Sequence, residues 1–394
     1  MTAVLGQERA LHVLREAMRH RHVSHAWIFH GPYGVGKFTA AAAFARLLLD
    51  PEATDESLAR FDPPQGTETA QLVERGLHPD LHIIRRTLAA VSDNPTLRSK
   101  RLSNIPIDLL REFMIGGECG DGRFREAPVF KSAVMGHAKV FIVEESELLD
   151  FVGQNALLKT LEEPPAHTYI VLLTTRVDRL LPTIRSRCQR VPFARLDEDS
   201  MRRWMQRHRL ALEGDAERWA LALADGSPGT AVFAARHDLH RWAEELGPEF
   251  DRLAQGEYAP KLGDMLARRV DELAKALVKE RESKASAPED DEGEGESDAG
   301  TAAGDGQPRT KASKQSANHE AAGWLAAVLG HVARQRLHEC VRKGHDPSFW
   351  LELVDLVGGA ERAVHSNLNL KHVFANLVTQ AADRAAMHRV GSAP

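Results

Sequence analysis

The stretch Lys139–Phe193, KVFIVEESELLDFVGQNALLKTLEEPPAHTYIVLLTTRVDRLLPTIRSRCQRVPF, decides the fold class. VFIV and YIVLL are short apolar runs of the kind that form parallel strands buried on both faces. The helix expected between them ends before Pro164-Pro165, because proline cannot continue a helix. A strand, a helix and a strand in this order predict an α/β protein with an open parallel sheet.

Polar side chains follow both predicted strands. Glu144 and Glu145 come directly after the first strand, and Thr174 and Thr175 end the second. Because ligands of open α/β sheets bind at the carboxyl ends of the strands, we expect these side chains at one ligand site. The run Arg185–Cys188 then adds two nearby guanidinium groups. These parts predict a nucleotide-handling site, used either by this chain itself or by a neighbouring subunit.

The composition is that of an ordinary globular protein. The chain has 394 residues, enough for two or three domains, with 43% hydrophobic and 27% charged residues. Its net charge of −5 gives no global basic field for tight nucleic-acid binding. Three separate cysteines, a charged amphipathic N-terminal segment and no run of ~18 apolar residues together predict a cytoplasmic protein.

A second motif lies in SHAWIFHGPYGVGKFTAAAAFARLLL, at residues 24–49. A short apolar run, a glycine-rich loop and a helix-forming run follow one another, which is the context that a P-loop requires. Gly31, Gly34 and Gly36 allow backbone N–H groups to point at a phosphate, and the helix N-terminus adds a favourable field. Lys37 is expected to contact the outer phosphates.

The residue after this lysine departs from the P-loop pattern. The pattern places Ser or Thr there, whose hydroxyl ligates Mg²⁺, whereas this chain has Phe38. Thr39 comes one residue later, ~100° further around the helix. Two interpretations stay open: a phosphate cradle with a damaged metal corner, and a glycine-rich turn that binds nothing.

The segments between these motifs are less regular. Residues 50–76 are polar with weak periodicity and predict a surface excursion, and residues 91–104 predict a polar loop. Between them, His78-Pro79-Asp80 precedes the strand-like run LHIIRR. His78 and His82 do not predict a metal site, because no third ligand lies nearby.

The C-terminal half is predominantly helical. Helical periodicity runs through residues 196–282 and returns at 320–388. Residues 283–318 lack large apolar side chains, and Glu289–Asp305 holds eight acidic residues and no basic one. Such a composition cannot form a packed core, so it predicts a disordered acidic insertion.

Together these motifs resemble the AAA+ clamp-loader subunits of bacterial DNA polymerase III, and the delta-prime subunit in particular. The resemblance covers most of residues 4–240 and, more loosely, residues 320–385. The GSPG at 226–229 favours delta-prime over gamma/tau. The motifs that carry the resemblance are SHAWIFHGPYGVGK, HPD, KVFIVEE, NALLKTLEEPP, LLPTIRSRC, GSPG and NLNL.

The resemblance implies an architecture. The fold would be an AAA+ P-loop parallel sheet with helices on both faces, a small helical lid and a C-terminal all-α collar. The implied domains are a nucleotide-binding-type domain at 1–195, a lid at 196–242 and a collar at 243–282 and 319–390. The acidic insertion at 283–318 is not part of the family pattern.

The resemblance also implies a function. Clamp loaders are rings of five such subunits, which open a sliding clamp and place it on primer–template DNA. The implied partners are therefore gamma/tau and delta subunits in a hetero-pentamer, with the clamp and DNA reached through the complex. Each ATP site joins a P-loop from one subunit with an arginine finger from the next. Arg187 stands at the finger position, where it would stabilise charge on the transferred phosphoryl group.

Several departures from the family pattern weaken this chain's own site. Glu144 replaces the expected metal-directed aspartate, while Glu145 stands where a water-polarising carboxylate is expected and Thr174 at the sensor-1 position. With Phe38, two magnesium-linked features are altered, so ATP with Mg²⁺ would bind to a degenerate site. Residues 50–77 contain no cysteine, so the zinc module of many relatives is not expected.

Two functional hypotheses follow. The first is a delta-prime-type stator that donates Arg187 and hydrolyses little ATP. The alternative is an ATP-hydrolysing motor subunit of gamma/tau type. Neither predicts a polymerase centre in this chain, which would make it an enzyme subunit only through the holoenzyme. Arg185 is expected at a ring interface or in a structural salt bridge, and Cys188 as a small buried side chain beside Arg187.

Overall fold

The computed structural model describes two compact units. The first comprises Met1–Ala211 and Ala224–Val232, and the second comprises Leu212–Leu223 and Phe233–Pro394. Each unit is described by itself. The described residues are 4–19, 23–99, 104–208, 210, 214–285, 307–366 and 368–391.

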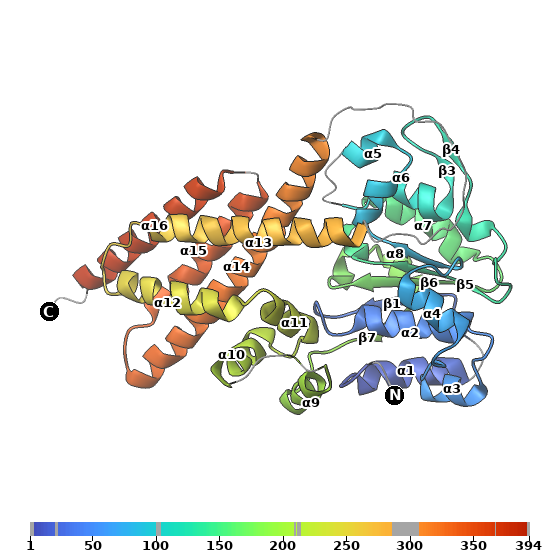
Figure 1. The fold of residues 1–394 in the computed structure, drawn as a ribbon, viewed down its shortest axis with the longest axis horizontal. Helices are drawn as coiled ribbons and strands as arrows, with labels where there is room; N and C mark the ends of the chain where they lie inside the picture. The colour runs from blue at the N-terminus through green and yellow to red at the C-terminus, as the bar shows by residue number, and fades with distance from the viewer. Residues whose placement is uncertain are drawn as a thin grey trace. The chain divides into compact units, whose positions relative to one another are not determined.

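A five-stranded parallel sheet forms the centre of the first unit (Figure 1). The strand order is β2-β5-β6-β1-β7, and every pairing between neighbours is parallel. The sequence-based prediction of an AAA+-type α/β sheet is therefore confirmed. The strands are β1 (Ala26–His30), β2 (Leu81–Ile84), β5 (Lys139–Val143), β6 (Thr168–Thr174) and β7 (Gln189–Pro192).

Helices cover both faces of this sheet, because alternate strand residues point to opposite sides. Trp27 and Phe29 of β1 pack with α1 (Glu8–Arg19) and α2 (Lys37–Leu49). On the other face, Ile28 packs with α7 (Phe151–Glu162) and α8 (Pro182–Arg187). The apolar strands seen in the sequence are thus buried on both sides, as expected.

Short elements complete the first unit. Those before β5 are α3 (Asp55–Arg60), α4 (Glu68–Arg75), η1 (Arg86–Val91), α5 (Pro95–Ser99), α6 (Ile107–Leu110), η2 (Arg111–Ile115), β3 (Gly117–Glu118), β4 (Phe124–Arg125) and η3 (Pro128–Phe130). Those after β5 are η4 (Ser146–Leu148), η5 (Val177–Arg179), α9 (Glu198–His208) and the start of α11 (Pro228–Arg236).

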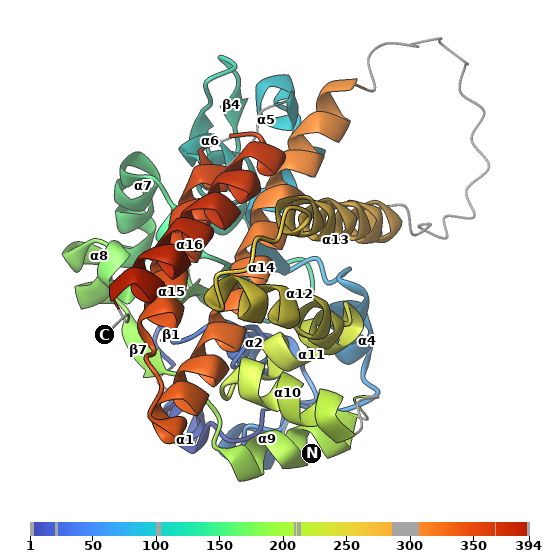
Figure 2. The ribbon, with the colours of Figure 1, turned by 90° about the vertical axis from the view of Figure 1, so that its left-hand side faces the viewer.

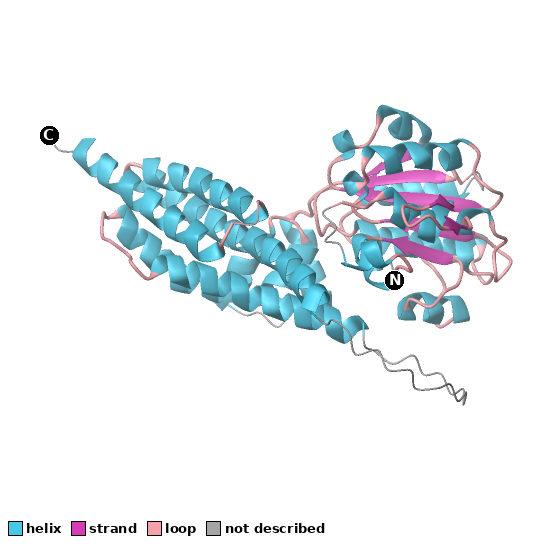
Figure 3. Ribbon diagram, turned by 90° about the horizontal axis from the view of Figure 1, so that it is seen from above, coloured by secondary structure: helices cyan, strands magenta, loops and turns pink. Residues whose placement is uncertain are grey.

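The second unit consists of helices in its described residues, whereas the strands lie in the first unit (Figure 3). Helices α13 to α16 pack side by side around one apolar core that includes Phe250, Leu325 and Phe374 (Figure 2). The helices are α10 (Gly214–Ala224), the end of α11, α12 (Leu239–Ala254), α13 (Leu262–Ala285), α14 (Gln307–Lys343), α15 (Ser348–His365) and α16 (Leu370–Gly391).

Three predictions about irregular segments need correction. Residues 50–76 form two capped helices, because Thr54 and Thr67 accept hydrogen bonds from backbone N–H groups in the first turns of α3 and α4. Part of residues 91–104 is helical as α5. Residues 283–285 end α13 and residues 307–318 begin α14, so the predicted disorder does not extend over these residues. Residues 286–306 lie outside the described residues.

The predicted domain boundaries at 195/196 and 242/243 do not coincide with the division between the two units and stay predictions. Within the described residues, no helix combines the length and the apolar character that crossing a membrane requires.

Candidate functional site

A cavity of about 360 Å³ opens at the carboxyl edge of the sheet, within the first unit. The loop after β1 contributes Gly34 to Gly36, and the first turn of α2 contributes Lys37 to Thr39. The segment after β5 contributes Glu144, Glu145 and Glu147, and the end of β6 contributes Thr174. The residues that the sequence analysis selected around the P-loop are therefore brought together. Gly31 does not line the cavity; it packs on Phe193, where a Cβ would lie 2.1 Å from the carbonyl oxygen.

The N-terminus of α2 faces this cavity with an open first turn. Gly36 precedes the helix in the left-handed conformation at φ 98°, which glycine adopts without strain. No side chain of the described residues caps this helix. Because the first N–H groups of a helix need acceptors, the turn is suited to an anionic ligand.

Lys37 folds back over the loop that precedes it. Its Nζ donates to the carbonyl oxygens of Gly31 at 2.7 Å and Pro32 at 2.5 Å. Burial lowers the pKa of Lys37 to about 8, and the negative charge of Glu147 partly opposes this shift. The ammonium group is thus held by neutral carbonyls, and a phosphate would give it a stronger partner.

The residues after the lysine give the cavity an apolar side. Phe38 is 40% exposed and lines the cavity where the P-loop pattern has a hydroxyl. Thr39 is also exposed and lines the cavity. The glycine loop and the lysine of the P-loop pattern are therefore present, while the hydroxyl next to the lysine is missing.

Glu144 and Glu145, which follow β5, have different electrostatic surroundings. Burial raises the pKa of Glu144; Arg85 opposes this shift and Glu145 adds to it. Glu145 has φ 49° and forms a two-pronged pair with Arg86, with Nε–Oε2 and Nη2–Oε1 distances of 2.9 Å. The carboxylate that was expected to polarise water is therefore engaged by a guanidinium group.

Glu147 is a cavity residue that the sequence analysis missed. Its Oε1 accepts from the backbone N–H of Thr175 at 3.1 Å and from the Thr175 hydroxyl at 2.6 Å. Burial pushes the pKa of Glu147 up, but hydrogen bonds, chiefly from Thr175, outweigh it and leave the pKa below its ordinary value. The spacing Glu-Glu-Ser-Glu after a buried strand was the available signal.

Thr174 is buried at the end of β6. Its hydroxyl accepts a hydrogen bond from the N–H of Arg176 at 3.0 Å, and its carbonyl accepts from Gly31 N–H at 3.2 Å. The residue lines the cavity but also ties the strand end to the loop after β1.

The segment Gly226–Gly229 forms direct hydrogen bonds with the P-loop. Ser227 Oγ donates to the carbonyl oxygen of Tyr33 at 2.9 Å, and Gly229 N–H donates to that of Gly34 at 2.9 Å. A Cβ on Gly229 would lie 2.7 Å from the Gly34 Cα, so this approach requires glycine. Pro228 also lines the cavity, at a place where it offers no charge to a phosphate.

Arg187 lies at the other edge of the sheet. It ends α8 just before β7 begins, and Glu162 ends α7 before β6 begins, so both stand at the amino ends of strands. An Nη2–Oε1 distance of 2.6 Å joins these two side chains. Arg187 Nη1 also donates to the Thr183 carbonyl oxygen at 3.0 Å. Arg187 therefore does not belong to the cavity that holds Lys37.

The neighbours of Arg187 are partly buried. Arg185 has a buried Nε without a hydrogen-bond partner in the described part of the chain, and its expected place at a ring interface or in a salt bridge stays a prediction. Cys188 is 8% exposed, as expected for a small buried side chain, and burial raises its pKa to about 12.

The HPD motif has a structural role. The Asp80 carboxylate accepts from the N–H groups of Val134 at 2.7 Å and Met135 at 2.8 Å, while His78 Nδ1 accepts from Asp80 N–H at 3.2 Å. Lys139 Nζ donates to the carbonyl oxygens of Pro128 and Lys131. Asp80 and Lys139, which are both buried and charged, thus hold residues 128–135 in place before β5.

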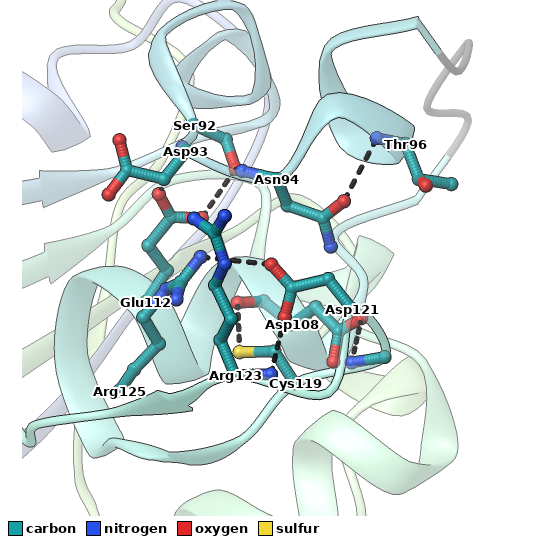
Figure 4. Close-up of polar contacts among 11 residues, drawn as sticks. Ser92, Asp93, Asn94, Thr96, Asp108, Glu112, Cys119, Asp121, Arg123 and Arg125 are labelled. Carbon is teal, nitrogen blue, oxygen red and sulfur yellow. Dashed lines mark hydrogen bonds and ion pairs between the residues drawn. The ribbon is translucent and has the colours of Figure 1, made fainter.

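A polar network links other parts of the irregular region before β5 (Figure 4). Glu112 accepts from the hydroxyl of Ser92 and the N–H of Asp93, and Asp108 accepts from Gly120 N–H at 3.0 Å. The network is internal to the unit and does not reach the cavity residues.

Comparison with known proteins finds similarity to DNA polymerase III subunits. A model of the family described as "DNA polymerase III, delta subunit" matches residues 6–197. DNA polymerase III subunit delta′ of Escherichia coli is 33% identical over 56% of this chain and 58% of its own length. Its counterpart in Bacillus subtilis is 30% identical over 48% of this chain and 47% of its own length.

A tau subunit is also similar to this chain. DNA polymerase III subunit tau of Bacillus subtilis is 30% identical over 58% of this chain and 36% of its own length. The chain thus spans between about a third and three fifths of the length of these relatives.

Proposed function

Since this chain is a member of the DNA polymerase III clamp-loader family, delta-prime or gamma/tau-like, we propose that it acts as the delta-prime-type stator of that complex. In this role it donates Arg187 to the ATP site of a neighbouring subunit during loading of a sliding clamp. Its own P-loop hydrolyses little ATP or none.

The placement of Arg187 carries the proposal. Lys37 lies at the carboxyl edge of the sheet, whereas Arg187 and its ion-pair partner Glu162 lie at the amino edge. An arginine at the amino edge does not reach a phosphate on this chain's own P-loop. A phosphate held by a second subunit against this edge would be within its reach, since Arg187 is about one-third exposed.

The state of the chain's own cavity supports the non-hydrolysing part. Phe38 supplies no hydroxyl for a metal ion, and Arg86 engages Glu145. Pro228 gives the cavity no positive charge from that side. Bound ATP with Mg²⁺ would supply the phosphates and the metal charge; Lys37 and the first turn of α2 are the groups that would hold a phosphate. The position next to Lys37 does not fit a metal ion, because Phe38 has no side-chain oxygen that could bind one.

The alternative is an ATP-hydrolysing motor of gamma/tau type. Its support is the complete glycine loop with Lys37 and the similarity to a tau subunit. A titration of the isolated chain separates the two functions. Mg²⁺-dependent ATP binding with turnover supports the motor, and absence of Mg²⁺-dependent ATP binding supports the stator.

The proposed partners are the gamma/tau and delta subunits of a hetero-pentamer. Through that complex the chain would act on the sliding clamp and primer–template DNA. Size-exclusion chromatography of the purified chain with the gamma and delta subunits of its own organism tests the assembly. One co-eluting complex is expected, and separate elution would contradict the proposal.

The Arg187→Ala variant tests the finger itself. The complex should assemble as before, while its clamp-stimulated ATPase rate falls, by about 10³-fold at the site that Arg187 serves if the effect matches other arginine fingers. An unchanged rate in an intact complex would remove the finger role. Arg176→Ala is a matched control, because Arg176 is exposed and paired with Asp178.

A further inference from the structure

Hydrogen bonds hold the Glu147 carboxylate in the cavity that Lys37 also lines. Both hydrogen bonds from Thr175 go to Oε1, and η4 places the residue immediately after β5. Held from the end of β6 in this way, the carboxylate is anchored on the sheet edge and lines the same cavity as Lys37.

The second oxygen of Glu147 is the unusual one. Oε2 is buried and has no hydrogen-bond partner in the described part of the chain. Because charges are weakly screened in a partly buried site, an ionised carboxylate there acts strongly on nearby charged groups. Lys37 feels this potential, since the charge of Glu147 raises the pKa that burial lowers.

The other two carboxylates of the cavity are partly compensated. Arg86 neutralises Glu145 through two hydrogen bonds, and burial favours the neutral form of Glu144. Pro228 and Gly229, which close the cavity from the other side, carry no charge. Glu147 therefore remains a negative charge in the described cavity; hydrogen bonds hold it in the ionised form, and its charge acts on Arg176 as well as on Lys37.

We propose that Glu147 sets the ligand preference of this P-loop by competing with phosphate for Lys37 and repelling polyphosphate from the cavity. The inference deepens the proposed stator function and rests on it. It names the side chain that keeps a complete glycine cradle from accepting a nucleoside triphosphate.

Two substitutions separate the charge of Glu147 from its structural bonds. Glu147→Gln keeps an oxygen that accepts from Thr175 but removes the charge, whereas Glu147→Asp keeps the charge. Isothermal titration of the full-length chain with the magnesium complex of AMP-PNP at neutral pH measures the effect. Glu147→Gln should bind roughly tenfold tighter than the unsubstituted chain, as expected for removal of a negative charge from a cavity that takes up a phosphate. Glu147→Asp should bind no tighter.

A salt series gives a second readout. The difference between Glu147→Gln and the unsubstituted chain should shrink as ionic strength rises, because the repulsion is electrostatic. Circular dichroism and a thermal melt show whether each variant is folded. Equal affinities of Glu147→Gln and the unsubstituted chain would overturn the inference, as would tighter binding by both variants.

The result of the Glu147 titration does not depend on whether Arg187 acts as an arginine finger. Titration of the isolated chain reports on Glu147, whereas the Arg187→Ala complex reports on the neighbouring ATP site. A failed Glu147 result with a positive Arg187 result would leave the stator function standing and remove only this inference.

Discussion

Arg187 and Glu162 form an ion pair of 2.6 Å at the edge of the sheet opposite to Lys37. Both side chains are partly exposed, and the pair joins the ends of α8 and α7. Within the single chain, the arginine is thus held by a carboxylate from its own unit. A phosphate from a neighbouring subunit would compete with Glu162 for the guanidinium group of Arg187.

Removal of the Glu162 charge should cost little stability. Glu162→Gln is expected to change the free energy of unfolding by less than about 1 kcal/mol, because exposed ion pairs contribute little. Urea denaturation of the full chain measures this. The same variant should retain the ATPase rate of the complex, since it leaves Arg187 in place. A loss similar to that of Arg187→Ala would show that the pair, not the finger, matters.

The close approach of Gly229 to Gly34 of the P-loop predicts that a larger side chain at position 229 would clash. Gly229→Ala places a Cβ 2.7 Å from the Gly34 Cα, so we expect a loss of about 1–3 kcal/mol in the free energy of unfolding of the first unit. Differential scanning calorimetry checks it. Gly330→Ala is the matched control, because a Cβ at this α14 position meets nothing within 4 Å. That change should stabilise the helix by roughly 0.5–1 kcal/mol. Equal effects of both changes would contradict the contact.

Two buried histidines of the second unit predict acid sensitivity. Burial lowers the pKa of His331, and Arg334 lowers it further; burial also lowers that of His237, against the opposing charge of Glu280. Below about pH 6.5 the unfolded chain binds protons that the folded chain does not. Stability is therefore complete above this pH and is lost as the pH falls toward the folded pKa values.

The loss in the free energy of unfolding is limited to ~1.4 kcal/mol per histidine for each pH unit. Urea denaturation at several pH values between about 7.5 and 5.5 measures the slope. Replacement of His331 and His237 by Gln should flatten it. A slope that the double variant leaves unchanged would assign the effect to other groups.

The cysteines should differ in reactivity. Cys188 has a pKa raised to about 12 by burial, and burial also raises that of Cys119. Cys340 is less buried than either. Because the thiolate is the reactive form, brief alkylation of the folded chain should modify Cys340 first. Mass spectrometry after proteolysis identifies the modified residue. Faster modification of Cys188 would contradict its buried placement.

The sheet could be predicted because its strands are continuous apolar runs with clear ends. The same holds for the grouping of Lys37, Glu144 and Thr174, since parallel strands present their carboxyl ends at one edge. The short helices α3 and α4 could not, because their apolar periodicity is weak and single threonine caps begin them.

Side-chain partners were beyond the sequence pattern. Arg86 and Glu145 are 59 positions apart, and nothing in either segment indicates that they pair. Glu147 is three residues after Glu144, but its role depends on Thr175 at the end of another strand. The pairing of Arg187 with Glu162 likewise depends on where two helices end. Such contacts follow from the three-dimensional arrangement of elements rather than from local spacing.

The most direct test of the stator function is single-turnover ATP hydrolysis by the assembled complex. Complexes containing the unsubstituted chain, Arg187→Lys or Arg187→Ala are compared at equal assembly. Lysine keeps the charge but not the planar two-pronged group, so both variants should slow hydrolysis at the site that Arg187 serves, with alanine the slower. Hydrolysis at the unsubstituted rate with Arg187→Ala would contradict the claim that this chain completes a neighbour's ATP site.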